Sequence, residues 1–198
     1  MRTQWVSLAL ATSLIMVGGN VAVAAERFED AIGDALGDAP DIVAVTVDDE
    51  DSPLVSISIE FGEERPFGSD METWTDAIFV IMAADPAVDE RGYLVSGAGY
   101  VTGTHAVQLD THVDSGAILL TPNAMLEDTV DVAVDGPVLT FTLDSGLMDS
   151  PPDLYFQILV GVERYEDGEE VTEGEEEGDM FPDEGEPPAH VQLDSVDR

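Results

Sequence analysis

The sequence predicts an all-β fold, a single antiparallel β-sandwich of the immunoglobulin or jelly-roll kind with about nine to ten strands. Short apolar runs, several of them alternating with small polar residues, recur along most of the chain. Gly, Pro and Asp cluster between these runs at close intervals, as they do in the turns of β proteins. No long segment carries the apolar period of a convincing helix.

The first 25 residues are typical of a secretory signal peptide. Arg2 supplies the positive start, residues 6–17 form the apolar centre, and residues 22–25 are a small-residue cleavage motif. A retained membrane anchor is the alternative, but the apolar centre is too short to span a bilayer and no stop-transfer pattern follows. We therefore expect a secreted, extracellular protein with one domain over residues 26–198 and no membrane span after signal removal.

The first two strands are expected at 42–47 and 54–61. The second alternates strictly between apolar and polar residues, which is typical of an antiparallel sheet with one wet face. The preceding stretch, 26–38, has apolar residues at helical spacing, but Gly33 and Gly37 weaken a helix. We expect a loop with one helical turn there.

Further strands follow from the same pattern. The segment 74–84 is apolar on both faces, which favours a central strand. Asp135-Gly136 indicates a hairpin, although Pro137 makes a two-residue turn less certain. The remaining expected strands cover 99–102, 105–111, 117–120, 129–134, 138–143, 154–162 and 189–193.

Residues 163–186 differ in composition from the rest of the chain. Thirteen of these 24 residues are acidic, and glycines recur among them. Such a segment is too charged to pack, so we expect a mobile, exposed acidic loop inserted before the final strand.

The charge of the whole chain is strongly negative. It has 43 Asp and Glu against six basic residues, all of them arginine, and a formal net charge of −37. Concentrated salt would screen the resulting self-repulsion, so we expect a halophilic protein. Ordinary acidic bias for solubility is the alternative. Nucleic acid is excluded as a partner, because its phosphates would be repelled.

An acidic constellation is the sharpest candidate site. If the first and last strands are neighbours, aspartates that lead into the first strand approach aspartates near the end of the chain, and Ca²⁺ would suit such a cluster of hard oxygen ligands. The alternative is that these side chains cap turns or belong to a halophilic surface. The candidate ligands are Asp30, Asp34, Asp38, Asp41, Asp179 and Asp183.

Aromatic side chains provide a second candidate site. Trp74, Tyr93 and Tyr165 could form a stacking platform for sugar rings, although Trp74 lies in an expected strand that could bury it. Tyr100 and Tyr155 also lie in expected strands, where core packing is favoured.

Catalytic chemistry is not expected. Cysteine is absent, which removes thiolate nucleophiles, disulfides and cysteine-ligated metals. His105, His112 and His190 are the histidines, and no Ser stands in a nucleophile motif beside them. Paired carboxylates for glycoside hydrolysis need an apolar pocket that the sequence does not locate.

The chain resembles the secreted β-sandwiches related to DOMON domains and family 9 carbohydrate-binding modules. The resemblance lies in Asp30-x-x-Gly33-Asp34, in Ala39-Pro40-Asp41-Ile42 before a valine strand, and in Asp179-x-x-Pro182-Asp183-x-Gly185 before the last strand. It implies one sandwich that binds sugars, haem or similar ligands without catalysis, in some members with structural calcium.

The sequence also departs from that family. Trp74 is the one tryptophan in residues 26–198, and the 85–92 turn lacks the family's denser Asp-x-Asp pattern. Haem-binding relatives pair a His with a Met, here Met71 or Met82, but spacing does not support this pair and haem is not favoured.

The expected function is therefore a secreted, non-catalytic binding module for carbohydrate or a similar small ligand, with a glycan or cell-surface component as partner and calcium as a possible cofactor. The alternative is a structural cell-surface or assembly protein that uses bound calcium and has no small-molecule ligand.

Overall fold

The structure is a computed structural model that describes residues 25–49, 53–62, 67–69, 73–84, 104–110, 116–166, 169–171, 178–183 and 186–193. Most of the expected signal peptide lies outside these residues, as do the expected strand 99–102, Tyr93 and His112. In the part of the chain that is described, no helix has the length and the apolar content needed to cross a membrane.

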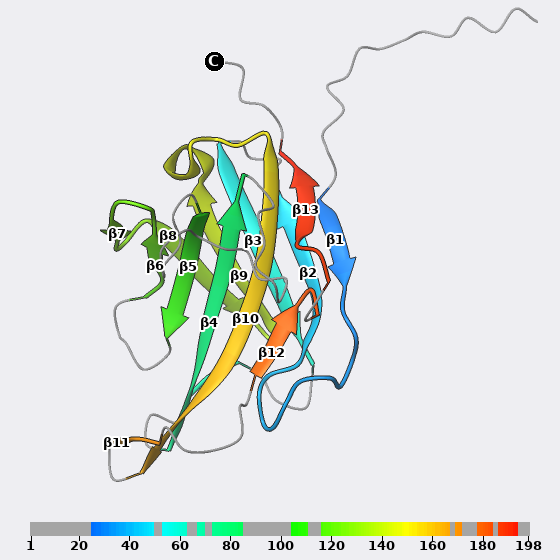
Figure 1. Cartoon of the computed structure of the whole chain (residues 1–198), viewed down its shortest axis with the longest axis vertical. Coiled ribbons are helices and arrows are strands. Elements are labelled where there is room, and N and C mark those ends of the chain that lie inside the picture. Colours follow the sequence, from blue (N-terminus) through cyan, green and yellow to red (C-terminus); the bar gives the residue numbers. More distant parts are fainter. Residues whose placement is uncertain are drawn as a thin grey trace, which may run out of the picture.

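Two antiparallel sheets pack face to face, which confirms the predicted β-sandwich (Figure 1). The five-stranded sheet has the order β1-β2-β3-β9-β8. Its strands are β1 (Glu26–Glu29), β2 (Ile42–Asp48), β3 (Leu54–Phe61), β8 (Val130–Asp135) and β9 (Val138–Asp144).

In the eight-stranded sheet, six strands follow the order β11-β10-β4-β5-β6-β7, and the remaining two, β12 and β13, pair with β10. Its strands are β4 (Trp74–Ala83), β5 (Thr104–Asp110), β6 (Ile118–Leu120), β7 (Met125–Leu126), β10 (Asp153–Glu166), β11 (Glu169–Glu170), β12 (Gly178–Phe181) and β13 (Ala189–Gln192). A short 3₁₀ helix, η1 (Ser145–Met148), follows β9.

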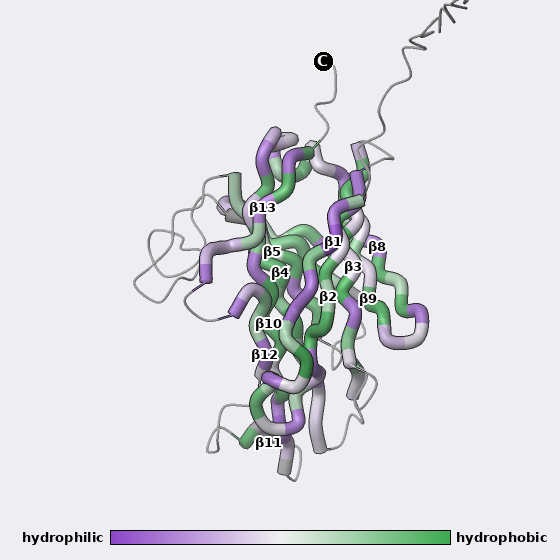
Figure 2. Tube along the Cα trace, turned by 90° about the vertical axis from the view of Figure 1, so that its right-hand side faces the viewer, coloured by the Kyte–Doolittle hydropathy of each residue, from purple (hydrophilic) through white to green (hydrophobic). Residues whose placement is uncertain are grey.

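The hydrophobic core lies between the two sheets. Figure 2 shows the two layers side by side, with hydrophobic segments along the central strands of each. In β3 the alternation predicted from the sequence is present: Val55, Ile57 and Ile59 are buried, while Ser56 and Ser58 are only partly buried. Burial of one face of each sheet is the main stabilising contribution to the fold.

Strand β10 organises the eight-stranded sheet. One of its edges pairs with β4 over the whole of β4, from Tyr155 with Ala83 to Arg164 with Trp74. Its other edge pairs with β13, then with β12, and finally with β11.

Strands β12 and β13 behave as one interrupted strand. Phe181 pairs with Ile158 and Ala189 with Phe156, so the chain leaves the sheet after Phe181 and rejoins it at Ala189, while β10 advances past the single residue Gln157. Asp183 lies in this connection, two residues after β12.

The β8–β9 hairpin turns at Gly136 and Pro137, between the paired residues Asp135 and Val138. Gly136 has φ 60°, the positive value that a type II′ turn requires at its first central position. The hairpin predicted at Asp135-Gly136 is confirmed, and Pro137 is accommodated at the second turn position.

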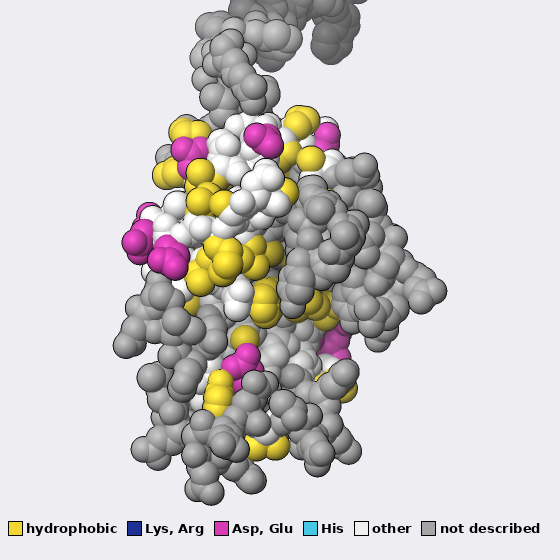
Figure 3. Space-filling view, turned by 60° about the vertical axis from the view of Figure 1, so that its left-hand side comes forward, with side chains coloured by type: hydrophobic (Ala, Val, Ile, Leu, Met, Phe, Trp, Pro, Cys, Tyr) yellow, Lys and Arg dark blue, Asp and Glu magenta, His cyan; other side chains and the backbone are white. Residues whose placement is uncertain are grey.

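Strand β8 is an edge of its sheet and is largely exposed. After Val130, every residue of β8 is exposed, Val134 at 68%. Figure 3 brings the side with β5 to β8 forward: hydrophobic side chains gather in its middle, acidic ones lie around them, and no Lys or Arg of the described residues is visible.

The structure differs from the sequence expectation in its short strands. The structure has strand β1 within 26–38, where we expected a loop with one helical turn, because Arg27, Phe28 and Glu29 pair along β2. Part of the expected loop 163–186 is strand, since β10 runs on to Glu166 and β11 and β12 also fall in this range.

Candidate metal centre

The lead-in between β1 and β2 reaches across to the other sheet. The Leu36 N–H donates to the Gly178 carbonyl at 2.8 Å, and the Gly178 N–H donates back to the Leu36 carbonyl at 3.1 Å. The expected cluster depended on the first and last expected strands, 42–47 and 189–193, being neighbours. In the structure they lie in different sheets: β2 pairs with β1 and β3, whereas β13 pairs with β10. The Leu36–Gly178 bridge instead brings the lead-in next to β12.

Gly178 has a steric role at this bridge. A Cβ added there would lie 2.8 Å from the Val160 carbonyl oxygen, closer than real Cβ atoms approach. Because the obstacle is backbone, β12 could not keep its place beside β10 with a larger residue. Glycine therefore lets β12 bring Asp179 against the lead-in.

Two aspartates of the cluster hold backbone in place. Both carboxylate oxygens of Asp41 accept the Gly33 N–H at 2.9 Å. Asp179 accepts the Ile42 N–H through Oδ2 at 2.6 Å and the Met180 N–H through Oδ1 at 2.8 Å. These are side-chain to backbone bonds of the kind through which Asp orders turns, and the bond from Ile42 to Asp179 joins β2 to β12.

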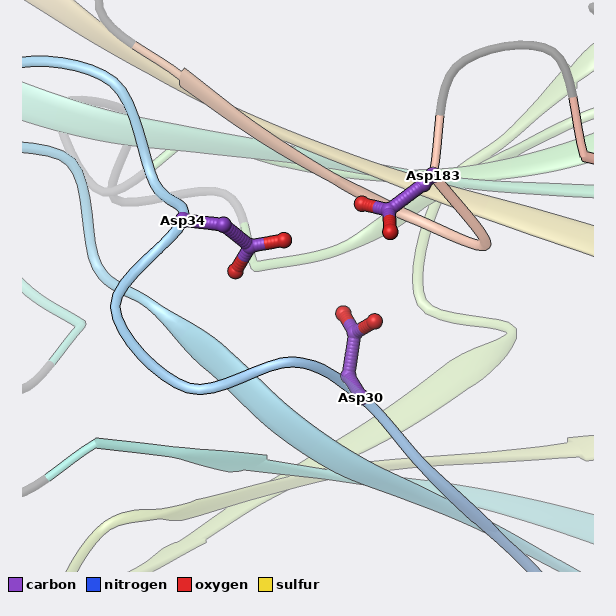
Figure 4. Close-up of side chains that lie close together, drawn as sticks. All are labelled: Asp30, Asp34 and Asp183. Atoms are coloured by element: carbon purple, nitrogen blue, oxygen red, sulfur yellow. The ribbon is translucent and has the colours of Figure 1, made fainter.

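Three further carboxylates converge beside them (Figure 4). Asp30 follows β1, Asp34 lies in the lead-in loop and Asp183 comes from the loop after β12, and one oxygen of each lies within 4.8 Å of the others. Asp34 also belongs to a second such group with Asp41 and Asp179. The two groups share Asp34, so five carboxylates form one acidic centre, defined here as Asp30, Asp34, Asp41, Asp179 and Asp183.

Asp30 is half-buried, and one of its two carboxylate oxygens is uncompensated. Its Oδ2 atom is inaccessible to solvent and has no hydrogen-bond partner among the described residues. The pKa of Asp30 is raised to about 7, mainly by burial and also by the charges of Asp179, Asp34 and Asp183, against a lowering by the Ala31 backbone. An ionised Asp30 is therefore costly unless a proton or a cation meets it.

The pKa values of two neighbours move in the same direction. Burial raises the pKa of Asp34, as do the charge of Asp179 and the contact with Asp183. Burial also raises the pKa of Asp179, with Asp41 and Asp183 adding to it, although the Ile42 and Met180 N–H groups oppose the rise. Asp30, Asp34 and Asp179 therefore resist simultaneous ionisation in the absence of a cation.

The donor set suits a hard divalent cation. Carboxylate oxygens are preferred by Ca²⁺ and Mg²⁺, and Ca²⁺ takes about six to eight oxygens in flexible geometry. Asp30, Asp34 and Asp183 offer oxygens to one point, and backbone carbonyls or waters could complete the shell. No thiolate or imidazole belongs to either group, so a soft metal has no matched donor in this centre.

Asp38 lies outside both groups. Its Oδ2 accepts a bond from Arg164 Nη2 at 2.9 Å, and its side chain is highly exposed. Asp38 was expected among the ligands because it lies, like Asp30, Asp34 and Asp41, in the lead-in to the first expected strand. The loop turns at Gly37, which has φ 69°, before Asp38 is reached.

The aromatic candidates do not share a described surface. Trp74 pairs with Arg164 across β4 and β10, and Tyr165 is the next residue of β10, so the pleat directs Trp74 and Tyr165 to opposite faces. The Tyr165 hydroxyl donates to Glu163 Oε2 at 2.7 Å. Tyr93 lies outside the described residues.

Two histidines have described surroundings. His190 Nε2 lies 3.0 Å from Asp153 Oδ1, and its ring stacks on Tyr155 with centroids 4.5 Å apart. His105 is half-buried and pairs with Met82 across β4 and β5. The sequence suggested Met82 as a histidine partner only for haem and located neither of these two arrangements, because both depend on the register between strands.

Comparison with known proteins found no matching family, no matching curated protein and no matching solved structure. The resemblance to DOMON domains and family 9 modules stays a prediction. The case for a function therefore rests on the chemistry of the acidic centre.

Proposed function

We propose that this chain is a non-catalytic, extracellular β-sandwich that binds a divalent cation, calcium by its oxygen chemistry, at Asp30, Asp34 and Asp183. The observation that carries the proposal is the buried, unpartnered Oδ2 of Asp30, surrounded by further carboxylates. A cation supplies the missing partner and offsets the mutual repulsion of the group.

A structural role fits the position of the centre. Asp30 follows an edge strand of one sheet and Asp183 follows β12 of the other, so a shared cation would tie the two sheets at one side. Asp41 and Asp179 already fix the backbone of this junction through hydrogen bonds. Metal binding would therefore add to folding stability through linkage.

This proposal favours the structural alternative over the carbohydrate-binding module. Stacking of sugar rings needs aromatic faces on one surface, and Trp74 and Tyr165 lie on opposite faces of the sheet. The acidic centre, in contrast, brings residues more than a hundred positions apart in sequence into one group. Cation binding by these carboxylates can be tested directly.

Adaptation to salt is part of the same proposal. A formal net charge of −37 with a well-formed apolar core implies repulsion that concentrated salt would screen. Unfolding measured at low salt and at multimolar NaCl tests this point. Marked stabilisation by NaCl supports it, and equal stability in both opposes it.

The direct test is equilibrium dialysis of calcium at multimolar NaCl. Wild type, Asp30→Asn and Asp34→Asn are compared with Asp131→Asn, whose side chain is exposed on β8. We expect the first two substitutions to remove a tightly bound ion and Asp131→Asn to keep it. An equal, small loss in all three variants would indicate diffuse binding to an acidic surface and would overturn the proposal.

A further inference from the structure

A second candidate site lies at the end of the sandwich where η1 covers the last residues of β4 (Figure 1). A cavity of about 290 Å³ opens there, lined by Met82, His105, Met148, Asp149 and Leu154, and by the prolines at 151 and 152. It shares no residue with the acidic centre.

The donors at this cavity are soft. Residues 26–198 contain five methionines, at positions 71, 82, 125, 148 and 180, and three histidines. Two of the five methionines and one of the three histidines line this one cavity. Because the chain has no cysteine, thioether sulfur and imidazole nitrogen are its soft and borderline donors.

The sheet register sets the first two donors side by side. Met82 and His105 are directly paired across β4 and β5. Side chains of such a pair share one face of the sheet, with Cβ atoms about 4.5–5.5 Å apart. Met82 is 1% exposed and His105 is half-buried at the rim. This face is the core side of β4, since Ile78 and Val80 on the same side are buried.

The loop around η1 provides the third donor. Asp144 Oδ1 accepts the Gly146 N–H at 2.8 Å and so caps the helix, and the Ser150 N–H donates to the Ser145 carbonyl at 2.8 Å. Met148 ends η1 and is buried at 4% exposure. These bonds hold Met148 against the cavity.

The two residues after η1 have unusual backbone. Asp149 has φ 64° and Ser150 has φ 46°, left-handed values that cost energy for residues other than glycine. Two such residues in succession place the Asp149 side chain at the cavity, where its charge acts on His105. A carboxylate near a ligating imidazole commonly orients the ring through its second nitrogen.

We propose that this cavity binds a soft monovalent cation, Cu(I), through the Sδ atoms of Met82 and Met148 and a ring nitrogen of His105. Thioethers select Cu(I) over hard cations, and imidazole binds it as well. The site is thus distinct in chemistry from the acidic centre, and it takes up copper already in the Cu(I) state, with no electron transfer required.

The test is competition for Cu(I) against a chromophoric chelator, under anaerobic reducing conditions. Sodium nitrate replaces chloride as the salt, because chloride itself binds Cu(I). Wild type is compared with Met82→Leu, Met148→Leu and His105→Gln, of which the first two conserve volume and should fold. The controls are Met125→Leu, at an exposed position of β7, and Asp30→Asn.

We expect each cavity substitution to weaken Cu(I) binding about tenfold or more, and both controls to bind as wild type does. X-ray absorption at the copper edge of the wild-type complex should show sulfur as well as nitrogen neighbours. Equal affinity in Met82→Leu, Met148→Leu and Met125→Leu, or a copper shell of oxygen and nitrogen alone, would overturn the proposal.

Discussion

Two parts of the molecule carry aspartates at the same four-residue spacing and use them differently. On β8, Asp131 and Asp135 are both exposed. In the lead-in, Asp30 and Asp34 converge on Asp183, and Asp30 keeps one oxygen buried without a partner. An extended strand separates equally spaced side chains, whereas a loop that folds back brings them together.

Acid density is therefore a poor indicator of a binding site in such a chain. The informative features are burial, an unpartnered oxygen and contacts between segments distant in sequence. They distinguish the lead-in from β8, although composition does not. The two regions should therefore respond differently to substitution, to calcium and to pH.

The largest effect should come from Phe156→Ala. Phe156 is fully buried in β10, and its ring lies 5.5 Å from Phe28 and 6.0 Å from Phe181, centroid to centroid. We expect a loss of about 3–5 kcal/mol in the free energy of unfolding, measured by denaturant at high salt. Calcium affinity of the folded protein should fall as well, because Phe28 and Phe181 come just before the loops that carry Asp30 and Asp183.

Phe141→Ala is the matched control for that variant. Phe141 is equally buried, but it lies on β9, and the pair tests whether the aromatic contacts of β10 support the centre. We expect a similar loss of stability with calcium affinity unchanged. Equal weakening of calcium binding in both variants would mean that general loosening, and not the contacts of Phe156, is responsible.

Gly178→Ala should have the next largest effect. The added Cβ would meet the Val160 carbonyl, so β12 must shift, at a cost of about 1–3 kcal/mol. Calcium affinity should fall with it, since Asp179 follows directly. Gly68→Ala is the control, because the nearest atom to its Cβ is a Trp74 carbon at an ordinary 3.8 Å. If Gly178→Ala binds calcium as tightly as wild type, the position of β12 does not matter for the site.

The effect of pH on the stability of the metal-free protein, measured in chelator, should be smaller than the effect of Gly178→Ala. Asp30 has a folded-state pKa of about 7, above its ordinary value of 3.8, so the folded state holds its proton more tightly than the unfolded state does. Its contribution to stability is present below pH 3.8 and is lost as pH rises through about 7. Because Asp30 is partly exposed, the pKa shift overstates this contribution, and we expect the free energy of unfolding to fall by about 1 kcal/mol.

Thermal unfolding in chelator at pH 5 and pH 8 measures this loss. Asp30→Asn should show a smaller difference between the two pH values than wild type, whereas Asp131→Asn should keep the wild-type difference. Identical pH dependence in the two variants would show that Asp30 does not titrate in this way.

The smallest effect should come from Asp38→Asn. Its ion pair with Arg164 is exposed, and such pairs contribute about 0–1 kcal/mol. Calcium binding should be unchanged, because Asp38 lies outside both carboxylate groups. Loss of a bound ion in Asp38→Asn would restore the six-ligand set expected from the sequence.

The sequence could predict the fold because the core strands carry a local signal. The alternation in residues 54–61 and the Asp135-Gly136 turn are each readable without knowledge of the rest of the chain. Strands β1 and β12 were not predicted, since their short, charged sequences become strands only through pairing with β2 and β10.

The candidate site was predictable only in outline. Aspartates near the beginning and the end of the domain in sequence indicated a cluster. The link between the lead-in and β12, however, depends on the Leu36–Gly178 bridge, which has no sequence signature. The Met82–His105 pair likewise follows from the register of β4 and β5. Long-range contacts of this kind are set by the fold as a whole.

If Asp30 faces a cation, Asp30→Asn should change the melting temperature in opposite directions without and with calcium. Asp30→Asn removes a charge that is unfavourable without metal and a ligand that is needed with it. Thermal unfolding is measured at pH 8 and high salt, in chelator and then in calcium, for wild type, Asp30→Asn and Asp131→Asn.

In chelator, Asp30→Asn should melt a few degrees above wild type, since it relieves the buried charge. At about a hundredfold excess of calcium over its Kd, wild type and Asp131→Asn should gain about 5–10 °C, and Asp30→Asn should gain little. An Asp30→Asn protein that melts below wild type in chelator and gains as much from calcium would contradict the proposed centre.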